Sequence, residues 1–197
     1  MIIWDEIYSD SDYVYGTKPN DFLKENIQSL KPGKVLCLAD GEGRNSVYLA
    51  KLGFEVTAVD SSTVGLEKGR RLAKDENVRV KFIHADLADY VIEPNHWDNI
   101  VSISCHLPSV LRKQVHSSVV NGLTSTGMLL LEAYTPKQLE YGTGGPPTAD
   151  FMMTLQELNK ELAGLEFLHE LEVIREVIEG SKHTGTASVV QLIAKKL

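Results

Sequence analysis

The chain has 197 residues, 43% of them hydrophobic, which is enough to build one α/β domain around a single core. Its formal net charge is −7; an acidic surface repels a phosphate backbone, so we expect a small-molecule partner and no nucleic acid. The two cysteines, Cys37 and Cys105, lie far apart in apolar stretches. This spacing excludes a disulfide framework and a zinc site, and we expect no bound metal.

The N-terminal stretch, MIIWDEIYSD (1–10), is acidic and lacks the basic start and the apolar stretch of a signal peptide. No apolar run approaches the roughly 20 residues that span a bilayer. We therefore expect a cytoplasmic protein without membrane contact, in which both thiols stay reduced.

Apolar runs and helical patterns alternate along the rest of the chain, after an outer helix predicted at 20–30. The apolar runs that predict parallel strands are 34–39, 54–60, 78–86, 97–105 and 127–134. Helical patterns follow them at 45–53, 62–75, 111–119 and 154–164. The second of these helices has Ser61 or Ser62 as its cap, and the last opens with a capping box formed by Thr154 and Glu157.

Two further strands are predicted in the tail, at 167–178 and 186–195, where the turn EGSKHTG makes them an antiparallel hairpin. The alternation predicts an α/β fold with a mostly parallel seven-stranded sheet covered by helices on both faces. We expect a single domain over 1–197, with 1–32 as an N-terminal cap or arm and 33–197 as the core. In such sheets ligands bind at the carboxyl ends of the strands.

A glycine turn, Asp40-Gly41-Glu42-Gly43, follows the first predicted strand. A phosphate-binding P-loop is excluded because Gly41 is followed five residues later by Ser46, with no lysine after it. A dinucleotide fingerprint is weakened because Ser46 stands where the third glycine belongs. The carboxylates of Asp40 and Glu42 would repel a pyrophosphate. A ligand with a cationic centre and no phosphate suits the turn better, and S-adenosylmethionine is such a ligand.

Two more acids follow the next two strands. Asp60 ends the second strand, 17 residues after Gly43 (60 − 43), where a carboxylate can accept both ribose hydroxyls. Asp86 follows the third strand and can accept from an adenine amino group, with Leu87 packed on the ring. Each acid alone could instead cap a helix, and a nicotinamide enzyme would also use Asp60. Three acids at successive strand ends favour the sulfonium nucleoside.

The sequence resembles the class I S-adenosylmethionine-dependent methyltransferases, and more narrowly their small bacterial tellurite-resistance-type branch. The resemblance is carried by VLCLADGEGRNSVYLAKLGFEVTAVDSS (35–62), ADL (85–87), WDNIVSISCHLP (97–108), LLLEAYTPKQLEYGTGGPP (129–147) and EGSKHTGTASVVQLIAKK (179–196). It implies a three-layer Rossmann-like methyltransferase fold. The sequence departs from the family at Cys37, where an acid is usual, and at Ala39, where glycine is usual; the acid that holds the methionine ammonium is then Asp40, or backbone carbonyls near Ala39 and Ser104 replace it.

The expected cofactor-binding residues are Ala39, Asp40, Gly41, Gly43, Arg44, Asp60, Ser61, Asp86, Leu87 and Ser104. His106 follows the fourth strand and is the candidate catalytic base, since an imidazole titrates near neutrality; a loop histidine bonded to backbone is the alternative. The expected substrate residues are Tyr15, Tyr134, Arg175 and His183. The Gly/Pro-rich loop 141–147 is a candidate lid.

These residues predict in-line methyl transfer to a small acceptor such as a thiol, a chalcogen oxyanion or a small acid. Two other functions stay open. A nicotinamide-dependent oxidoreductase could use the same sheet, although it predicts a third glycine and a neutral turn. A non-catalytic module that binds S-adenosylmethionine would keep the cofactor half and leave the acceptor side undistinguished.

Overall fold

The computed structural model describes residues 4–197; the first three residues of the predicted N-terminal arm lie outside this part. The strands are β1 (Lys34–Leu38), β2 (Glu55–Asp60), β3 (Lys81–His84), β4 (Trp97–Ile103), β5 (Leu123–Tyr134), β6 (Leu165–Glu179) and β7 (His183–Lys196). They form one seven-stranded sheet in the order β3-β2-β1-β4-β5-β7-β6. Strands β1 to β5 pair in parallel, and β7 runs antiparallel to both β5 and β6. The predicted mixed sheet with a C-terminal antiparallel hairpin is confirmed.

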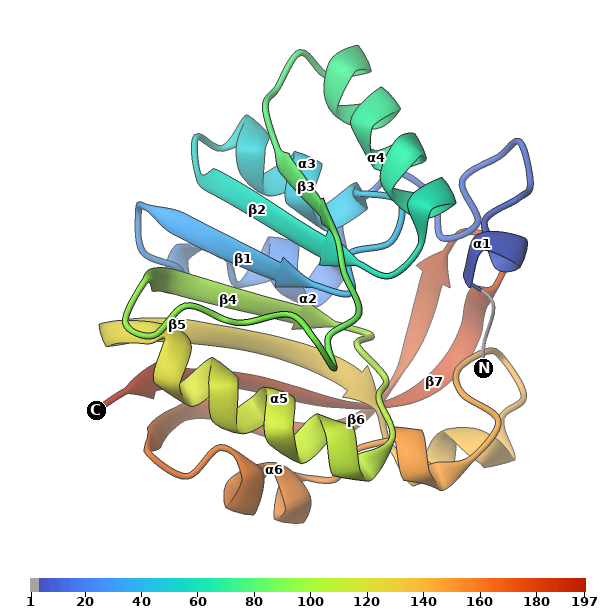
Figure 1. Cartoon of the computed structure of the whole chain (residues 1–197). Coiled ribbons are helices and arrows are strands. Elements are labelled where there is room, and N and C mark those ends of the chain that lie inside the picture. Colours follow the sequence, from blue (N-terminus) through green and yellow to red (C-terminus); the bar gives the residue numbers. More distant parts are fainter. Residues whose placement is uncertain (1–3) are drawn as a thin grey trace.

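Helices cover both faces of this sheet (Figure 1), with α5 and α6 on one face and α2 and α3 on the other. The α-helices are α1 (Trp4–Ile7), α2 (Asp21–Glu25), α3 (Arg44–Lys51), α4 (Thr63–Asp75), α5 (Ser109–Gly122) and α6 (Leu155–Glu161). Short 3-10 helices are η1 (Ile27–Ser29), η2 (Pro136–Glu140) and η3 (Ala149–Phe151). No helix within residues 4–197 combines the length and the apolar character needed to cross a membrane.

The central strands are apolar throughout because side chains alternate between two cores. In β1, Leu36 and Leu38 pack with α5 and α6, whereas Val35 and Cys37 pack with α2 and α3. Strands buried on both faces appear in a sequence as continuous apolar runs, which is why these runs predicted the sheet.

Local signals set the helix starts. The Ser62 hydroxyl accepts the Gly65 N–H at 3.0 Å and caps α4. The predicted capping box of Thr154 and Glu157 is present at α6. Such caps satisfy backbone N–H groups that have no partner inside the helix.

Several element boundaries differ from the prediction, and three of these differences have a physical reason in the structure. The helix predicted over 20–30 ends at Glu25 and continues as η1, because only Phe22 and Leu23 of α2 enter the core. Strand β3 is only four residues long, since it lies at the sheet edge and pairs with β2 alone. Strand β5 starts at Leu123, four residues before the predicted start, where it pairs with Trp97 across a register shift.

The N-terminal arm crosses to the carboxyl ends of the strands, and α1 lies beside the start of α4 (Figure 1). The Asp5 carboxylate accepts the Ser62 hydroxyl at 2.5 Å and the Val64 N–H at 3.2 Å. Asp5 therefore fastens α1 to the first turn of α4, above the strand ends where ligands bind in such folds.

Candidate cofactor and acceptor site

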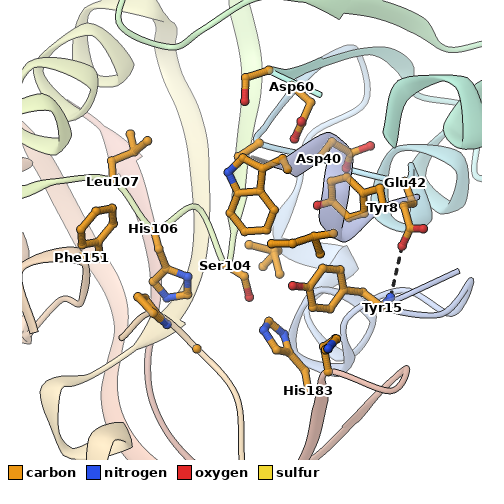
Figure 2. Close-up of a pocket in the computed structure, with 18 of the residues that line it drawn as sticks. Tyr8, Tyr15, Asp40, Glu42, Asp60, Ser104, His106, Leu107, Phe151 and His183 are labelled. Carbon is orange, nitrogen blue, oxygen red and sulfur yellow. Dashed lines mark hydrogen bonds between the residues drawn. The ribbon is translucent and has the colours of Figure 1, made fainter. Parts of the chain in front are cut away.

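A cavity of about 440 Å³ opens at the carboxyl ends of β1 to β4. The strand ends form its floor. The N-terminal arm, the 144–151 segment and the β6–β7 turn provide the other walls. Figure 2 shows Asp40 and Asp60 at one end of this cavity and His106, His183 and Tyr15 toward the other. The two ends therefore differ in charge.

The two glycines of the turn, which were expected to contact the cofactor, support the cavity without lining it. Gly41 and Gly43 have φ values of 58° and 87°, which glycine adopts at no steric cost. A Cβ on Gly43 would lie 2.8 Å from the Cα of Gly69 in α4. The Gly41 N–H donates to Asp60 Oδ2 at 2.8 Å. The two glycines thus shape the turn and fix its distance from β2 and α4.

Three carboxylates lie together at the acidic end. The sequence placed each of them after a parallel strand, and the carboxyl ends of these strands lie at one edge of the sheet. Asp40, Asp60 and Asp86 all line the cavity, with Ser61 and Leu87 beside them. Both oxygens of Asp60 accept backbone N–H groups, from Gly41 and from Ser62, each at 2.8 Å. These bonds fix the Asp60 carboxylate in position, and its remaining lone pairs can accept hydroxyl groups of a ligand.

Asp40 carries a perturbed carboxyl group. Burial raises its pKa to about 7; the hydrogen bond from the Ser46 hydroxyl opposes this effect, and the charge of Asp60 adds to it. A cation placed between the two acids would favour their charged forms. The acidic end is therefore chemically suited to a positively charged ligand.

This shift predicts how stability depends on pH. Unfolded aspartate loses its proton near pH 4, whereas folded Asp40 keeps its proton to about pH 7. The unfolded state then binds fewer protons between these values, so the contribution of Asp40 to stability falls as pH rises from about 4 to about 7. We expect Asp40→Asn to gain stability relative to wild type between pH 5 and pH 8 in urea unfolding. A constant difference across that range would contradict the prediction.

Strained backbone lines the same floor. Ala39 and Ser104, at the ends of neighbouring strands β1 and β4, have φ values of 49° and 53°. Residues other than glycine rarely adopt this left-handed region, and such strain is concentrated at functional sites. Ala39 thus has a backbone conformation that glycine would adopt at lower cost.

A substitution measures this strain. Ala39→Gly is expected to stabilise the protein by about 0.5–1 kcal/mol, because relief of left-handed strain exceeds the added entropy of the unfolded chain. The control is Ala50→Gly in α3, where glycine should destabilise by about 1 kcal/mol. Both are read by thermal unfolding, and a lower Tm for Ala39→Gly would show that the turn is not strained.

Glu42 has a different role from the one its position suggested. Its carboxylate accepts the Lys68 ammonium at 2.8 Å and the N–H groups of Val14 and Tyr15 at 3.2 Å (Figure 2). Glu42 borders the cavity, but these bonds make it the anchor of the N-terminal arm. Because Lys68 balances the charge of Glu42, Asp40 is the acid of the turn that would mainly repel a pyrophosphate.

His106 lines the acceptor end in a neutral form. Its Nε2 accepts the Tyr134 N–H at 2.9 Å, so Nδ1 carries the ring proton. Burial is the main cause that lowers the pKa of His106 to about 3, and the neighbouring His183 adds to this effect. This geometry speaks against the predicted role of His106 as a base and leaves it as a hydrogen-bond donor.

His183 borders the cavity from the start of β7. Its ring lies 4.4 Å from the Tyr15 ring and 5.2 Å from the Tyr134 ring, centroid to centroid. Its Nδ1 lies 3.7 Å from Oε2 of Glu179. The neighbouring Lys182 also lines the cavity, so this wall is basic.

Two predicted substrate residues lie behind the wall. Arg175 is paired with Glu132 at 2.7 Å and with Asp21 at 3.6 Å, and it does not line the cavity. Tyr134 also lies outside the lining and stacks on His106, with ring centroids 5.3 Å apart. The expectation that Arg175 reaches substrate is corrected, because its guanidinium group is already held by the buried carboxylate of Glu132 and lies near the exposed carboxylate of Asp21.

Sequence reasoning missed several lining residues. Trp4, Ile7 and Tyr8 from the N-terminal arm, Phe151 from η3 and Lys182 from the hairpin turn all border the cavity. One signal was available: Trp4 and Tyr8 are spaced as i and i+4, which brings side chains together on a helix. Their rings stack with centroids 5.8 Å apart. The rest reach the cavity only through tertiary folding.

This sheet order, with a cavity at the carboxyl ends of the strands, is the fold of the class I S-adenosylmethionine-dependent methyltransferases, a class in which S-adenosylmethionine is the cofactor. The sequence profile of the family "Tellurite resistance protein TehB" matches residues 1–130. The chain belongs to this family.

Individual relatives agree with this assignment. The chain is 32% identical over 98 residues to a probable S-adenosyl-L-methionine-dependent methyltransferase TehB of Haemophilus influenzae, covering 46% of this chain and 34% of that protein. It is 43% identical over 79 residues to a demethylmenaquinone methyltransferase of Clavibacter sepedonicus, covering 40% and 31%. The chain therefore spans about a third of the length of these relatives. The crystal structure of TehB from Haemophilus influenzae superposes with a TM-score of 0.73 at 22% identity, over 90% of this chain and 62% of that one.

Proposed function

We propose that the protein transfers a methyl group from S-adenosylmethionine to a small acceptor that is anionic or rich in lone pairs. Thiols, chalcogen oxyanions and small acids belong to this class. The observation that carries the proposal is the division of one cavity into an acidic end, with Asp40, Asp60 and Asp86, and a basic end, with Lys182 and His183.

The residues at the acidic end fit a cationic nucleoside. Asp60 would accept the ribose hydroxyls, and Asp86 the adenine amino group with Leu87 against the ring. The charges of Asp60 and Arg44 act on the Asp40 carboxyl in opposite directions. Asp40 would hold the ammonium group of the cofactor. Bound S-adenosylmethionine supplies an electrophilic methyl group on a positive sulfur, so the main task of the chain is alignment and the exclusion of water.

The basic end fits an anionic acceptor. Lys182 provides a cation, the Nδ1–H of His106 a hydrogen-bond donor, and His183 a ring nitrogen that can take a proton. The carboxylates nearest this wall, Glu132 and Glu179, are bonded to Arg175 and Arg44. An acceptor anion at this wall would therefore meet donors and no unpaired carboxylate from these two residues.

The covering segments favour a small acceptor over a nucleic acid. Tyr8 and Trp4 close the cavity from the arm, and Phe151 and Pro146 close it from the opposite loop. Together with the net charge of −7, this enclosure disfavours a polyanionic strand. We propose that residues 1–197 act as one domain, with the N-terminal 32 residues as its cap, and that the protein works in the cytoplasm.

One experiment separates the open functions. Thermal shifts are measured with S-adenosylmethionine, S-adenosylhomocysteine and NADH, and S-adenosylhomocysteine release is then followed against thiols, chalcogen oxyanions, small acids and bulk tRNA. We expect stabilisation by the two sulfur nucleosides and turnover with a small anionic acceptor. Stabilisation by NADH alone would make the protein an oxidoreductase. Binding without turnover on the whole panel would favour a non-catalytic module, and turnover on tRNA alone would overturn the small-acceptor class.

A further inference from the structure

We propose that Glu179 is a positioning residue for methyl transfer: it holds His183 with Nδ1–H toward its own carboxylate and Nε2 free for the acceptor's proton. This inference rests on the proposed function only in placing the acceptor beside His183. The orientation of the ring is a property of this chain alone and is measured without any acceptor.

The two side chains are close but not yet bonded. Glu179 ends β6 and His183 begins β7, so the tight turn between them places both on one side of the hairpin. Their nearest atoms, Glu179 Oε2 and His183 Nδ1, are 3.7 Å apart. Nδ1 is buried and has no hydrogen-bond partner within residues 4–197. A movement of about 0.8 Å would give a normal hydrogen bond, and such catalytic bonds often tighten only when ligands bind.

Glu179 is held ionised for this task. Its Oε2 accepts the Arg44 guanidinium at 2.7 Å, and its Oε1 accepts the Asn20 side-chain N–H at 2.8 Å. Burial by itself would raise the pKa of Glu179, but His183, Arg44 and Asn20 outweigh burial and hold that pKa well below its usual range. Glu179 therefore carries its negative charge at neutral pH.

Among the ion pairs formed within residues 4–197, His183 has Glu179 as its acidic partner. Tyr15 and Tyr134 flank the His183 ring, and burial raises the pKa of Tyr15 to about 12 and that of Tyr134 well above its usual value. Both phenols are thus neutral. His106 is the nearest imidazole and is also neutral, and Lys182 is the adjacent cation. Glu179 is consequently the group that can stabilise a positive charge on His183.

The proton balance follows from this arrangement. For an acceptor X–H, the X–H bond breaks, X bonds to the methyl group as the sulfur–methyl bond breaks, and the proton moves to Nε2 of His183. The imidazolium then lies against the Glu179 carboxylate until the proton passes to solvent. An acceptor that is already an anion skips the proton step and makes no use of Glu179.

The test compares Glu179→Gln with Glu132→Gln. Both carboxylates accept the same Asn20 side-chain N–H group, at 2.8 Å and 2.7 Å, but Glu132 is paired with Arg175 instead of facing His183. Ring 15N NMR at neutral pH reports the tautomer of His183, whose signals are assigned by their loss in His183→Gln. We expect the Nδ1–H tautomer in wild type and in Glu132→Gln, and a mixed tautomer in Glu179→Gln.

The activity readout separates positioning from a general structural effect. Glu179→Gln should lower kcat/KM at least tenfold for acceptors that must lose a proton and much less for acceptors that are already ionised. An Nε2–H tautomer in the wild-type protein would overturn the proposal even if Glu179→Gln does not fold. An unchanged tautomer in Glu179→Gln, or an equal change in Glu132→Gln, would overturn it as well. Absence of turnover with the expected tautomers would contradict the proposed function and leave the positioning role standing.

Discussion

Replacing Asp60 with alanine is expected to weaken S-adenosylmethionine binding by about 1.5–3 kcal/mol, or roughly 10- to 150-fold, the range for hydrogen bonds to a charged group. The reason is geometric. Two backbone N–H bonds, from Gly41 and Ser62, already fix this carboxylate at 2.8 Å each. The carboxylate can therefore accept ribose hydroxyls without losing further side-chain entropy. The binding free energy of each hydrogen bond is then not reduced by an ordering cost.

Titration calorimetry with S-adenosylmethionine and S-adenosylhomocysteine measures the effect, and both ligands should lose affinity alike because they share the ribose. The matched control is Asp89→Ala, an exposed acid outside the cavity lining, which should leave both dissociation constants unchanged. Circular dichroism checks that Asp60→Ala is folded, since its two backbone partners lose an acceptor. Unchanged affinity in a folded Asp60→Ala would show that the ribose is held elsewhere.

The sheet could be predicted because its pattern is local. Apolar runs such as 34–39 are continuous where a strand is buried on both faces, and the helices between them have their own caps. The strand-end acids followed from topology, since parallel strands bring their carboxyl ends to one edge. Asp40, Asp60 and Asp86 therefore share a cavity although 46 residues separate the first from the last (86 − 40).

The acceptor side could not be predicted in the same way because its roles depend on distant partners. Arg175 was available as an anion ligand until β5 placed Glu132 beside it. The tautomer of His106 is decided by the backbone N–H of Tyr134, 28 residues away. Helix α1 has only four residues, so the spacing of one pair, Trp4 and Tyr8, is all the helical pattern that the sequence offers there. Neither composition nor residue spacing predicts that Arg175 pairs with Glu132 or that His106 accepts the Tyr134 N–H.

The glycine turn organises both ends of the cavity. Asp40 borders the acidic end, and Glu42, two residues later, fastens the arm that carries Tyr15 onto His183. Arg44, two residues further, bonds the carboxylate behind His183. Side chains of the turn and of the residue after it therefore contact the acidic end of the cavity, the N-terminal arm and the carboxylate behind His183. A shift of the turn would move all three.

The second large effect is expected at His183. His183→Gln should lower kcat by about 10²-fold for acceptors that must lose a proton, the lower part of the range for general base catalysis. Glutamine keeps hydrogen-bonding capacity but cannot take a proton at this position. The affinity for S-adenosylmethionine should stay the same, because the strand-end acids that would hold it lie at the other end of the cavity.

His106→Gln provides the contrast, since the neutral His106 offers only its Nδ1–H and its loss should raise KM and leave the pH dependence of kcat in place. His96→Gln, near the amino end of β4 and bonded to Glu93 at 3.0 Å, controls for the substitution itself and should change neither constant. Steady-state rates of S-adenosylhomocysteine release between pH 6 and pH 9 give all three results. The proton-accepting role would belong to His106 if His106→Gln lowered kcat and altered its pH dependence while His183→Gln had no effect. In that case the hydrogen bond from the Tyr134 N–H to His106 would have to break during turnover.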